Sequence, residues 1–297
     1  RHTMSRTCVC CAAARLIFRD LRCRFVRRRE LFLKRLLLWT LTAVAVLLMS
    51  GKEESEWGND IVALLNRSIF FLAMNTITSI LSLPTIYEFF EARAGVLQEL
   101  EARVVPPAVY AMCWTVVQCI ERLMFSTVFA AILVLGLPLR ADAQARLFFI
   151  FVLILINLVT GLLDFMVSTV CRSYVRALAL KVALLCFLMV FGASLVAVDT
   201  ENADLTQGGL SDVLIKFSYF HYSYAALMRN ELADEAFVFS FRGISVVDLQ
   251  GEFLLEFLGI AQPMATSLGL MLAFGAGFLL LGILGLMWTL APGRRAA

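Results

Sequence analysis

Six apolar stretches separated by charged loops constrain the fold of this chain more than any other feature. A bilayer core of about 30 Å requires roughly 20 apolar residues in helical form. Backbone amides cannot stay unpaired in hydrocarbon, and continuous apolar runs lack the alternation of a membrane β-barrel. The stretches are Leu36–Ser50, Ile61–Leu83, Tyr110–Leu137, Leu147–Val170, Val175–Val198 and Pro263–Leu290. The sequence therefore predicts an all-α membrane protein with six transmembrane helices, of which the first is short.

The composition and the loop charges support this prediction. Hydrophobic residues make up 61% of the chain and charged residues 16%, values that soluble domains rarely reach. Residues 1–35 carry eleven arginines and lysines against Asp20 and Glu30. Basic segments favour the cytosolic side, so we expect both termini in the cytosol, at the plasma membrane or an organelle membrane. Arg140 and Arg146 fall in a loop expected outside, but this loop is short.

Two regions follow from this pattern. Residues 1–35 predict a cytosolic connector with an Arg-rich amphipathic helix along the inner leaflet, although a simple positive-inside anchor explains the charge equally well. Residues 36–297 predict the six-helix transmembrane domain. Within it we expect a cytosolic helix at 86–103 and an external segment at 199–262 with short helices that partly enter the outer leaflet.

The sequence contains no complete motif for catalysis or metal binding. The chain has two histidines and lacks His-Glu-x-x-His, Gly-x-Ser-x-Gly and the Gly-x-x-x-x-Gly-Lys-Ser/Thr phosphate loop. We therefore expect no metal site, no cofactor in this chain and no ATP hydrolysis by the chain alone. Nothing points to nucleic acid. A chain that starts at Arg1 is expected to be a fragment or a separated domain.

Seven segments resemble, in the correct order, the membrane domain of G-subfamily ABC transporters, the white and multidrug-resistance half-transporter type. They are Asn66-Arg67-Ser68, the stretch Arg93 to Glu99, Tyr110, the stretch Gly136 to Phe149, Phe191-Gly192, Tyr219–Leu232 and Gly251 to Ile260. The chain departs from that pattern in Ile69, where glycine is usual, in Pro106-Pro107 and in the lack of external cysteines.

The resemblance implies several partners and sites. It implies a nucleotide-binding domain, upstream or separate, that holds ATP and Mg²⁺, and a second transmembrane half in a homo- or heterodimer within membrane lipid. It implies that Arg93 and Glu99 serve coupling, with Glu99 touching the 11–35 helix. It also implies a substrate pocket near Asn75, Thr78, Cys186, Met189, Ser194 and Leu195.

Ionisable residues inside the membrane are functional candidates because bare charges there are costly. Asp164 and Lys181 each lie about six residues from the same inner turn, at a depth of about 9 Å, which predicts an ion pair. One helix face carries four polar residues, Asn157, Thr160, Asp164 and Ser168. They either form hydrogen bonds between helices or line a water-filled path. Glu121 and Arg122 either pair with each other or face the pocket, and the sequence does not decide between these alternatives.

The leading hypothesis is the transmembrane half of an ATP-driven exporter of lipids, sterols or amphipathic small molecules. The alternatives are a non-transporting membrane scaffold and a channel-like protein. A channel would need a filter of charges or carbonyls, and no such motif is visible. A membrane enzyme is disfavoured by the missing catalytic motifs.

Overall fold

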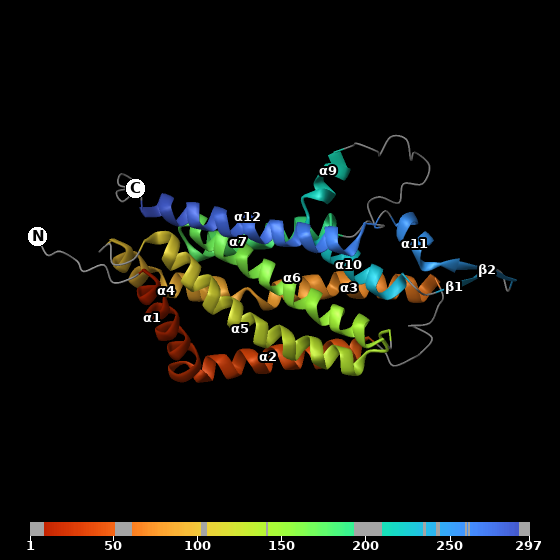
Figure 1. Ribbon diagram of the computed structural model, residues 1–297, viewed down its shortest axis with the longest axis horizontal. Helices are drawn as coiled ribbons and strands as arrows, with labels where there is room; N and C mark the ends of the chain where they lie inside the picture. The colour runs from red at the N-terminus through yellow and green to blue at the C-terminus, as the bar shows by residue number, and fades with distance from the viewer. Residues whose placement is uncertain are drawn as a thin grey trace, which may run out of the picture.

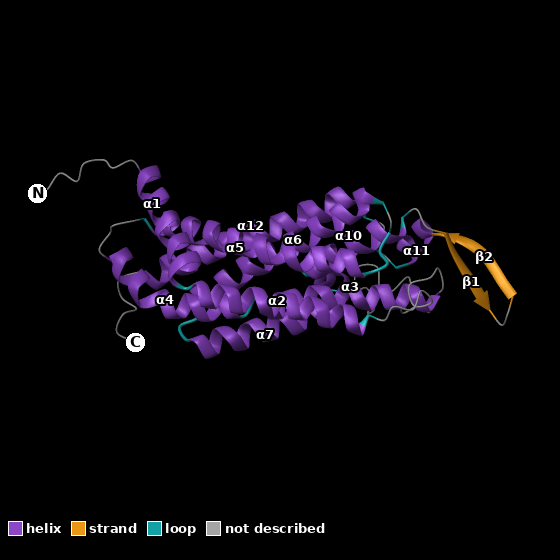
Figure 2. Cartoon of the chain, turned by 90° about the horizontal axis from the view of Figure 1, so that it is seen from below, coloured by secondary structure: helices purple, strands orange, loops and turns teal. Residues whose placement is uncertain are grey.

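The computed structural model describes residues 9–50, 61–101, 106–140, 142–192, 210–233, 236–241, 244–258, 260 and 262–290. Long helices lie side by side in an elongated bundle (Figure 1). One end of the bundle carries α1 and α4 and is called the α4 end below. A two-stranded hairpin projects beyond the other end (Figure 2), which is called the hairpin end.

The elements follow one another along the chain in a fixed order. They are α1 (Val9–Arg22), the π-helical turn η1 (Cys23–Arg27), α2 (Arg29–Met49), α3 (Ile61–Leu81), α4 (Pro84–Glu101), α5 (Pro107–Gly136), α6 (Ala143–Val170), α7 (Tyr174–Val190), α9 (Leu210–Lys216), α10 (Tyr219–Leu232), β1 (Ala236–Phe241), β2 (Ile244–Gln250), α11 (Gly251–Phe257) and α12 (Met264–Leu290).

Five helical stretches are long and apolar enough to cross a membrane: Arg29–Met49, Leu64–Arg93, Pro107–Gly136, Ala143–Val170 and Met264–Thr289. The predicted fifth span, Val175–Val198, is represented by α7, which has 17 residues and ends at Val190. Residues 193–200 lie outside the described part of the chain. The structure therefore gives five candidate spans among its described residues, and the sixth stays a prediction.

Helix α6 lies at the centre of the bundle, and glycines let α12 approach it closely. A Cβ added at Gly282 would lie 2.6 Å from ring carbons of Phe165, and one at Gly275 would lie 3.2 Å from Leu162. Small residues are favoured where helices pack within membranes, because lipid tails supply no hydrophobic drive between helices. These contacts explain why the last span needs glycines on its α6-facing side.

Among its described residues, the segment 199–262 forms three helices, α9, α10 and α11, and a hairpin that the sequence did not predict; the external position of the segment stays a prediction. Strands β1 and β2 pair antiparallel, with an irregularity between Val238 and Phe239. Helix α10 runs back into the bundle (Figure 1), where every residue except Arg229 is buried. Its aromatic residues therefore pack against the spans instead of sitting at the lipid interface.

Candidate coupling site and intramembrane charge network

At the α4 end, two carboxylates and two guanidinium groups form a closed ring of ion pairs. Arg24 Nη1 lies 2.5 Å from Glu121 Oε2 and 3.2 Å from Glu88 Oε2. Arg35 completes the ring, at 2.5 Å from Glu88 Oε1 and 3.1 Å from Glu121 Oε1. All four side chains are at most 18% exposed. The ring therefore joins the segment η1–α2 to both α4 and α5.

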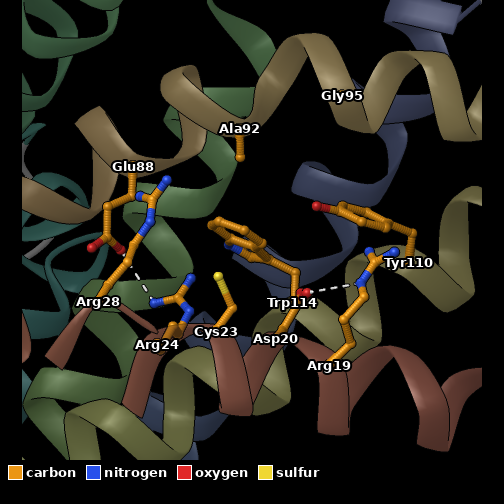
Figure 3. A pocket seen from close by; sticks show the side chains of 10 residues that line it. All are labelled: Arg19, Asp20, Cys23, Arg24, Arg28, Glu88, Ala92, Gly95, Tyr110 and Trp114. Atoms are coloured by element: carbon orange, nitrogen blue, oxygen red, sulfur yellow. Dashed lines mark hydrogen bonds and ion pairs between the residues drawn. The ribbon is translucent and has the colours of Figure 1, made fainter. Parts of the chain in front are cut away.

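A cavity of about 230 Å³ lies beside this ring. Side chains from η1, α4 and α5 converge on it, among them Arg24, Glu88 and Trp114 (Figure 3). The guanidinium carbon of Arg24 lies 4.9 Å from the centre of the Trp114 ring, a cation–π distance. The single turn of π-helix that presents Arg24 is a form found often at functional sites.

Outside the ring, Arg28 and Glu91 add a more exposed pair. Arg28 donates two hydrogen bonds to Glu91, at 3.1 and 3.2 Å. The hydrogen bond to Glu91 raises the pKa of Arg28, and it outweighs the opposing effect of burial. Both side chains are more than two-fifths exposed, so solvent screens this pair and its contribution to stability is small.

Arg93 connects α4 to the turn between α6 and α7. Its Nη1 donates a 2.8 Å hydrogen bond to the carbonyl of Cys171, and its guanidinium lies 5.2 Å from the Phe90 ring. Burial raises the pKa of the Cys171 thiol, against the lowering effect of Arg93 and Arg176. The side chain of Glu99 lies outside the described residues, so its contact with the 11–35 segment stays a prediction. In the structure, Glu88 and Glu91 are the acids of α4 whose side chains pair with that segment among the described residues.

Deeper in the bundle, Asp164 of α6 faces two cations. Lys181 Nζ of α7 lies 2.8 Å from Asp164 Oδ1, in an ion contact without the geometry of a directed hydrogen bond. Arg122 Nη2 of α5 donates a 3.0 Å hydrogen bond to Asp164 Oδ2. Asp164 and Lys181 have no exposed surface. The structure thus brings the predicted pair together and adds Arg122, which the sequence analysis did not assign to it.

Polar residues of the predicted α6 face extend this network. Arg122 also donates to Asn157 Oδ1 at 3.0 Å, and the Asn157 amide donates to Ser126 over a short distance. Thr160 exchanges a 2.9 Å hydrogen bond with the Tyr219 hydroxyl on α10. These α6 residues are all fully or almost fully buried. In this structure the polar face packs helices together and does not line an open cavity.

A comparison with protein families bears on both networks. The family model for ABC-2 type transporters matches residues 14–232, more than two thirds of the chain. The chain belongs to the ABC-2 type transporter family. No curated protein matches it. It is thus a transmembrane component of a transporter and an integral, multi-pass membrane protein, and membrane domains of this family typically partner with a nucleotide-binding domain.

In this ABC-2 domain the predicted pocket residues do not share one surface. Asn75 is buried and accepts a 3.0 Å hydrogen bond from Ser223 of α10. Thr78 is buried and donates to the Met74 carbonyl, whereas Cys186 and Met189 lie on the exposed side of α7. Ser194 and Leu195 lie outside the described residues. The pocket stays a prediction, and the buried α3 positions support α10 within this protomer.

A different hollow is present at the hairpin end of the ABC-2 domain, between α2 and α3. It has a volume of about 310 Å³ and is mostly apolar. Its lining residues are Val46, Met49, Ser50, Asn66, Ile69, Phe70, Ala73, Met74 and Ile77. This hollow was not predictable from the sequence, because a groove between two helices depends on their packing and leaves no motif. Within the described part of the chain, no group of three or more His, Cys, Asp or Glu side chains is placed to hold a metal ion.

Proposed function

We propose that this domain is the transmembrane half of an ATP-driven exporter of the G-subfamily type. ATP and Mg²⁺ would bind to a nucleotide-binding domain that is upstream or on a separate chain, and a second transmembrane half, identical or not, would complete the transporter. The observation that carries the proposal is the ring of Arg24, Arg35, Glu88 and Glu121, because it fastens the connector segment to α4 and α5 at one end of the bundle.

The ring suits force transmission from a soluble motor. A displacement of α4 acts on Glu88, and through Arg24 and Arg35 on α5, since one pair of arginines serves both carboxylates. Arg93 carries the same displacement to the α6–α7 turn through its hydrogen bond to the Cys171 carbonyl. In this mechanism α4 is the coupling helix and faces the cytosol, in agreement with the arginines of α1 at the same end.

The proposed substrates are lipids, sterols or amphipathic small molecules. Apolar side chains dominate the outward faces of α3 and α7, where Ile69, Ile80 and Val182 are between 46% and 59% exposed. A path built between two such faces offers few charges, so it favours apolar and amphipathic solutes over ions or sugars. The resemblance of the motifs in α3, α4 and α10 to G-subfamily half-transporters supports this class.

The test is reconstitution of the chain with its nucleotide-binding domain in proteoliposomes, with ATP hydrolysis and movement of a fluorescent lipid measured side by side. We expect the variant Glu88→Gln/Glu121→Gln to retain ATP hydrolysis and to lose ATP-dependent transport of the fluorescent lipid. Without the ion pairs of the ring, a displacement of α4 is no longer transmitted to α5. Glu252→Gln, on an exposed residue at the hairpin end, is the matched control and should transport like the parent. Movement that is equal with and without ATP would refute the exporter function.

A further inference from the structure

Between Ala13 and Arg22, helix α1 turns one face toward the bundle and another away from it. On the inner face, Cys113 of α5 donates a 3.7 Å hydrogen bond to the carbonyl of Ala13. Leu16 packs against the apolar cluster that includes Tyr110 and Trp114. These contacts fix which side of α1 points away from the protein.

The outer face of α1, which Val26 continues into η1, combines arginines with large apolar side chains. Phe18 is 69% exposed and Val26 is 63% exposed, while Arg15 and Arg22 are also exposed. Arg19 lies 3.6 Å from Asp20 at the surface, with its side chain 57% exposed. A shallow groove of about 810 Å³ follows this face. The spacing of three, four and seven residues from Arg15 places these side chains along one stripe of the helix.

Six of the arginines between residues 15 and 35 differ in their contacts. Arg24, Arg28 and Arg35 bind carboxylates of α4 and α5. The outer group, Arg15, Arg19 and Arg22, lines the groove, where the acid is Asp20, and Arg19 also borders the cavity beside the ring. The outer group is thus a basic surface, and its charge selects an anionic occupant.

The position of α1 in the bundle indicates that this surface faces the membrane interface. Helix α1 runs across the α4 end of the bundle, and the first candidate span begins at Arg29 (Figure 1). A helix that directly precedes the first span is expected at the level of lipid headgroups. At that level exposed apolar side chains such as Phe18 and Val26 suit the acyl boundary, and guanidinium groups suit bidentate binding of phosphate.

We infer that the outer face of α1 is a binding site for anionic phospholipid, with Arg15, Arg19 and Arg22 holding the headgroup phosphate and Phe18 and Val26 contacting the acyl chains. Because η1 continues directly from α1 and carries Arg24, a lipid bound here also holds the ring of ion pairs in place. The inference concerns a lipid site and does not depend on the proposed export function.

The experiment uses the full chain in nanodiscs of phosphatidylcholine that contain 20 mol% phosphatidylserine, an order-of-magnitude choice near cytosolic-leaflet charge. Native mass spectrometry counts the phosphatidylserine and phosphatidylcholine molecules retained on the protein. We compare Arg15→Gln/Arg19→Gln/Arg22→Gln with the matched control Arg172→Gln/Arg176→Gln, exposed arginines of the turn after α6 and of the first turn of α7. Tryptophan emission and size-exclusion profiles establish that each variant is folded.

We expect the triple variant to lose phosphatidylserine selectivity by about fivefold or more for each arginine, while the control keeps it. Phe18→Ser should weaken retention of both lipids and leave their ratio unchanged. Equal phosphatidylserine selectivity in the triple variant and the parent would overturn the site. So would a triple variant that retains phosphatidylserine normally but no longer binds a nucleotide-binding domain, because the surface would then belong to a protein partner.

Discussion

Replacing Asp164 by asparagine should destabilise this protein more than any other single change to its buried charges. The carboxylate lies between Arg122, at 3.0 Å, and Lys181, at 2.8 Å, and it has no exposed surface. Asparagine keeps the size of the side chain and removes its charge. Two buried cations are then left facing a neutral amide.

The expected cost follows from the count of charges. Loss of one partner from a buried ion pair costs about 3–5 kcal/mol, because the remaining charge is uncompensated. Lys181→Met, in contrast, leaves Asp164 paired with Arg122 and turns a triad of net charge +1 into a neutral pair. Its cost should be about 1–2 kcal/mol, for one carboxylate oxygen that loses a partner. The asymmetry between the two substitutions is the specific prediction.

Thermal unfolding of the purified chain in detergent, followed by intrinsic fluorescence, measures these differences. A cost of this size corresponds to a fall in Tm of roughly 6–20 °C for Asp164→Asn. The double variant Asp164→Asn/Lys181→Met should unfold at a higher temperature than Asp164→Asn alone, since one unpaired cation is removed. Val182→Ala, on the exposed side of α7, is the control and should change stability by less than about 0.5 kcal/mol. Equal effects of the two single substitutions would refute the triad.

Three further predictions test other contacts. Glu121→Gln should lower the Tm by several degrees because Arg24 and Arg35 each lose one of their two charged partners. Glu252→Gln, at an exposed position, should not lower it, and equal Tm values of the two variants would count against the ring. Gly282→Ala should lower the free energy of unfolding by about 1–3 kcal/mol, because the added methyl group meets the Phe165 ring. Gly277→Ala is the control, since the space around Gly277 is open and the protein should not be destabilised. A larger loss of stability for Gly277→Ala than for Gly282→Ala in thermal unfolding would contradict the packing of α12 on α6. Because burial raises the pKa of Cys171, its maleimide labelling at pH 7 should be slower than that of glutathione and should still rise with pH after glutathione has levelled off; parallel pH profiles would contradict this.

Much of the fold could be predicted from the sequence because membrane spans are recognised as long runs of apolar residues. Five apolar stretches correspond to candidate spans, since the hydrocarbon thickness sets a length that a continuous run must meet. The end of α7 at Val190 was not predictable, because residues 191–198 are also largely apolar. The burial of α10 was missed for a related reason. Its tyrosines suit a lipid interface and a protein interior equally well, and the choice depends on helices distant in the sequence.

The site could be predicted only where two residues share a short connection. Asp164 and Lys181 flank the same turn, so counting residues from that turn gives both the same depth. Arg122 has no such reference. It lies 14 residues before the end of α5 and Asp164 lies 21 residues after the start of α6, which at about 1.5 Å per residue are heights of about 21 and 32 Å from the same loop. Arg122 binds Asn157, which lies at the matching height on α6, and the length of its side chain lets it reach Asp164 as well.

The adjacent residues Glu121 and Arg122 link the two charge networks. Neighbours on an α-helix point about 100° apart, so they cannot form the internal pair that their sequence suggests. Glu121 binds Arg24 and Arg35 on one side of α5, and Arg122 binds Asp164 on another. A rotation of α5 about its own axis would break both sets of contacts at once. The two networks therefore hold α5 in a single rotational setting, and a movement that keeps both intact must carry α5 together with α6.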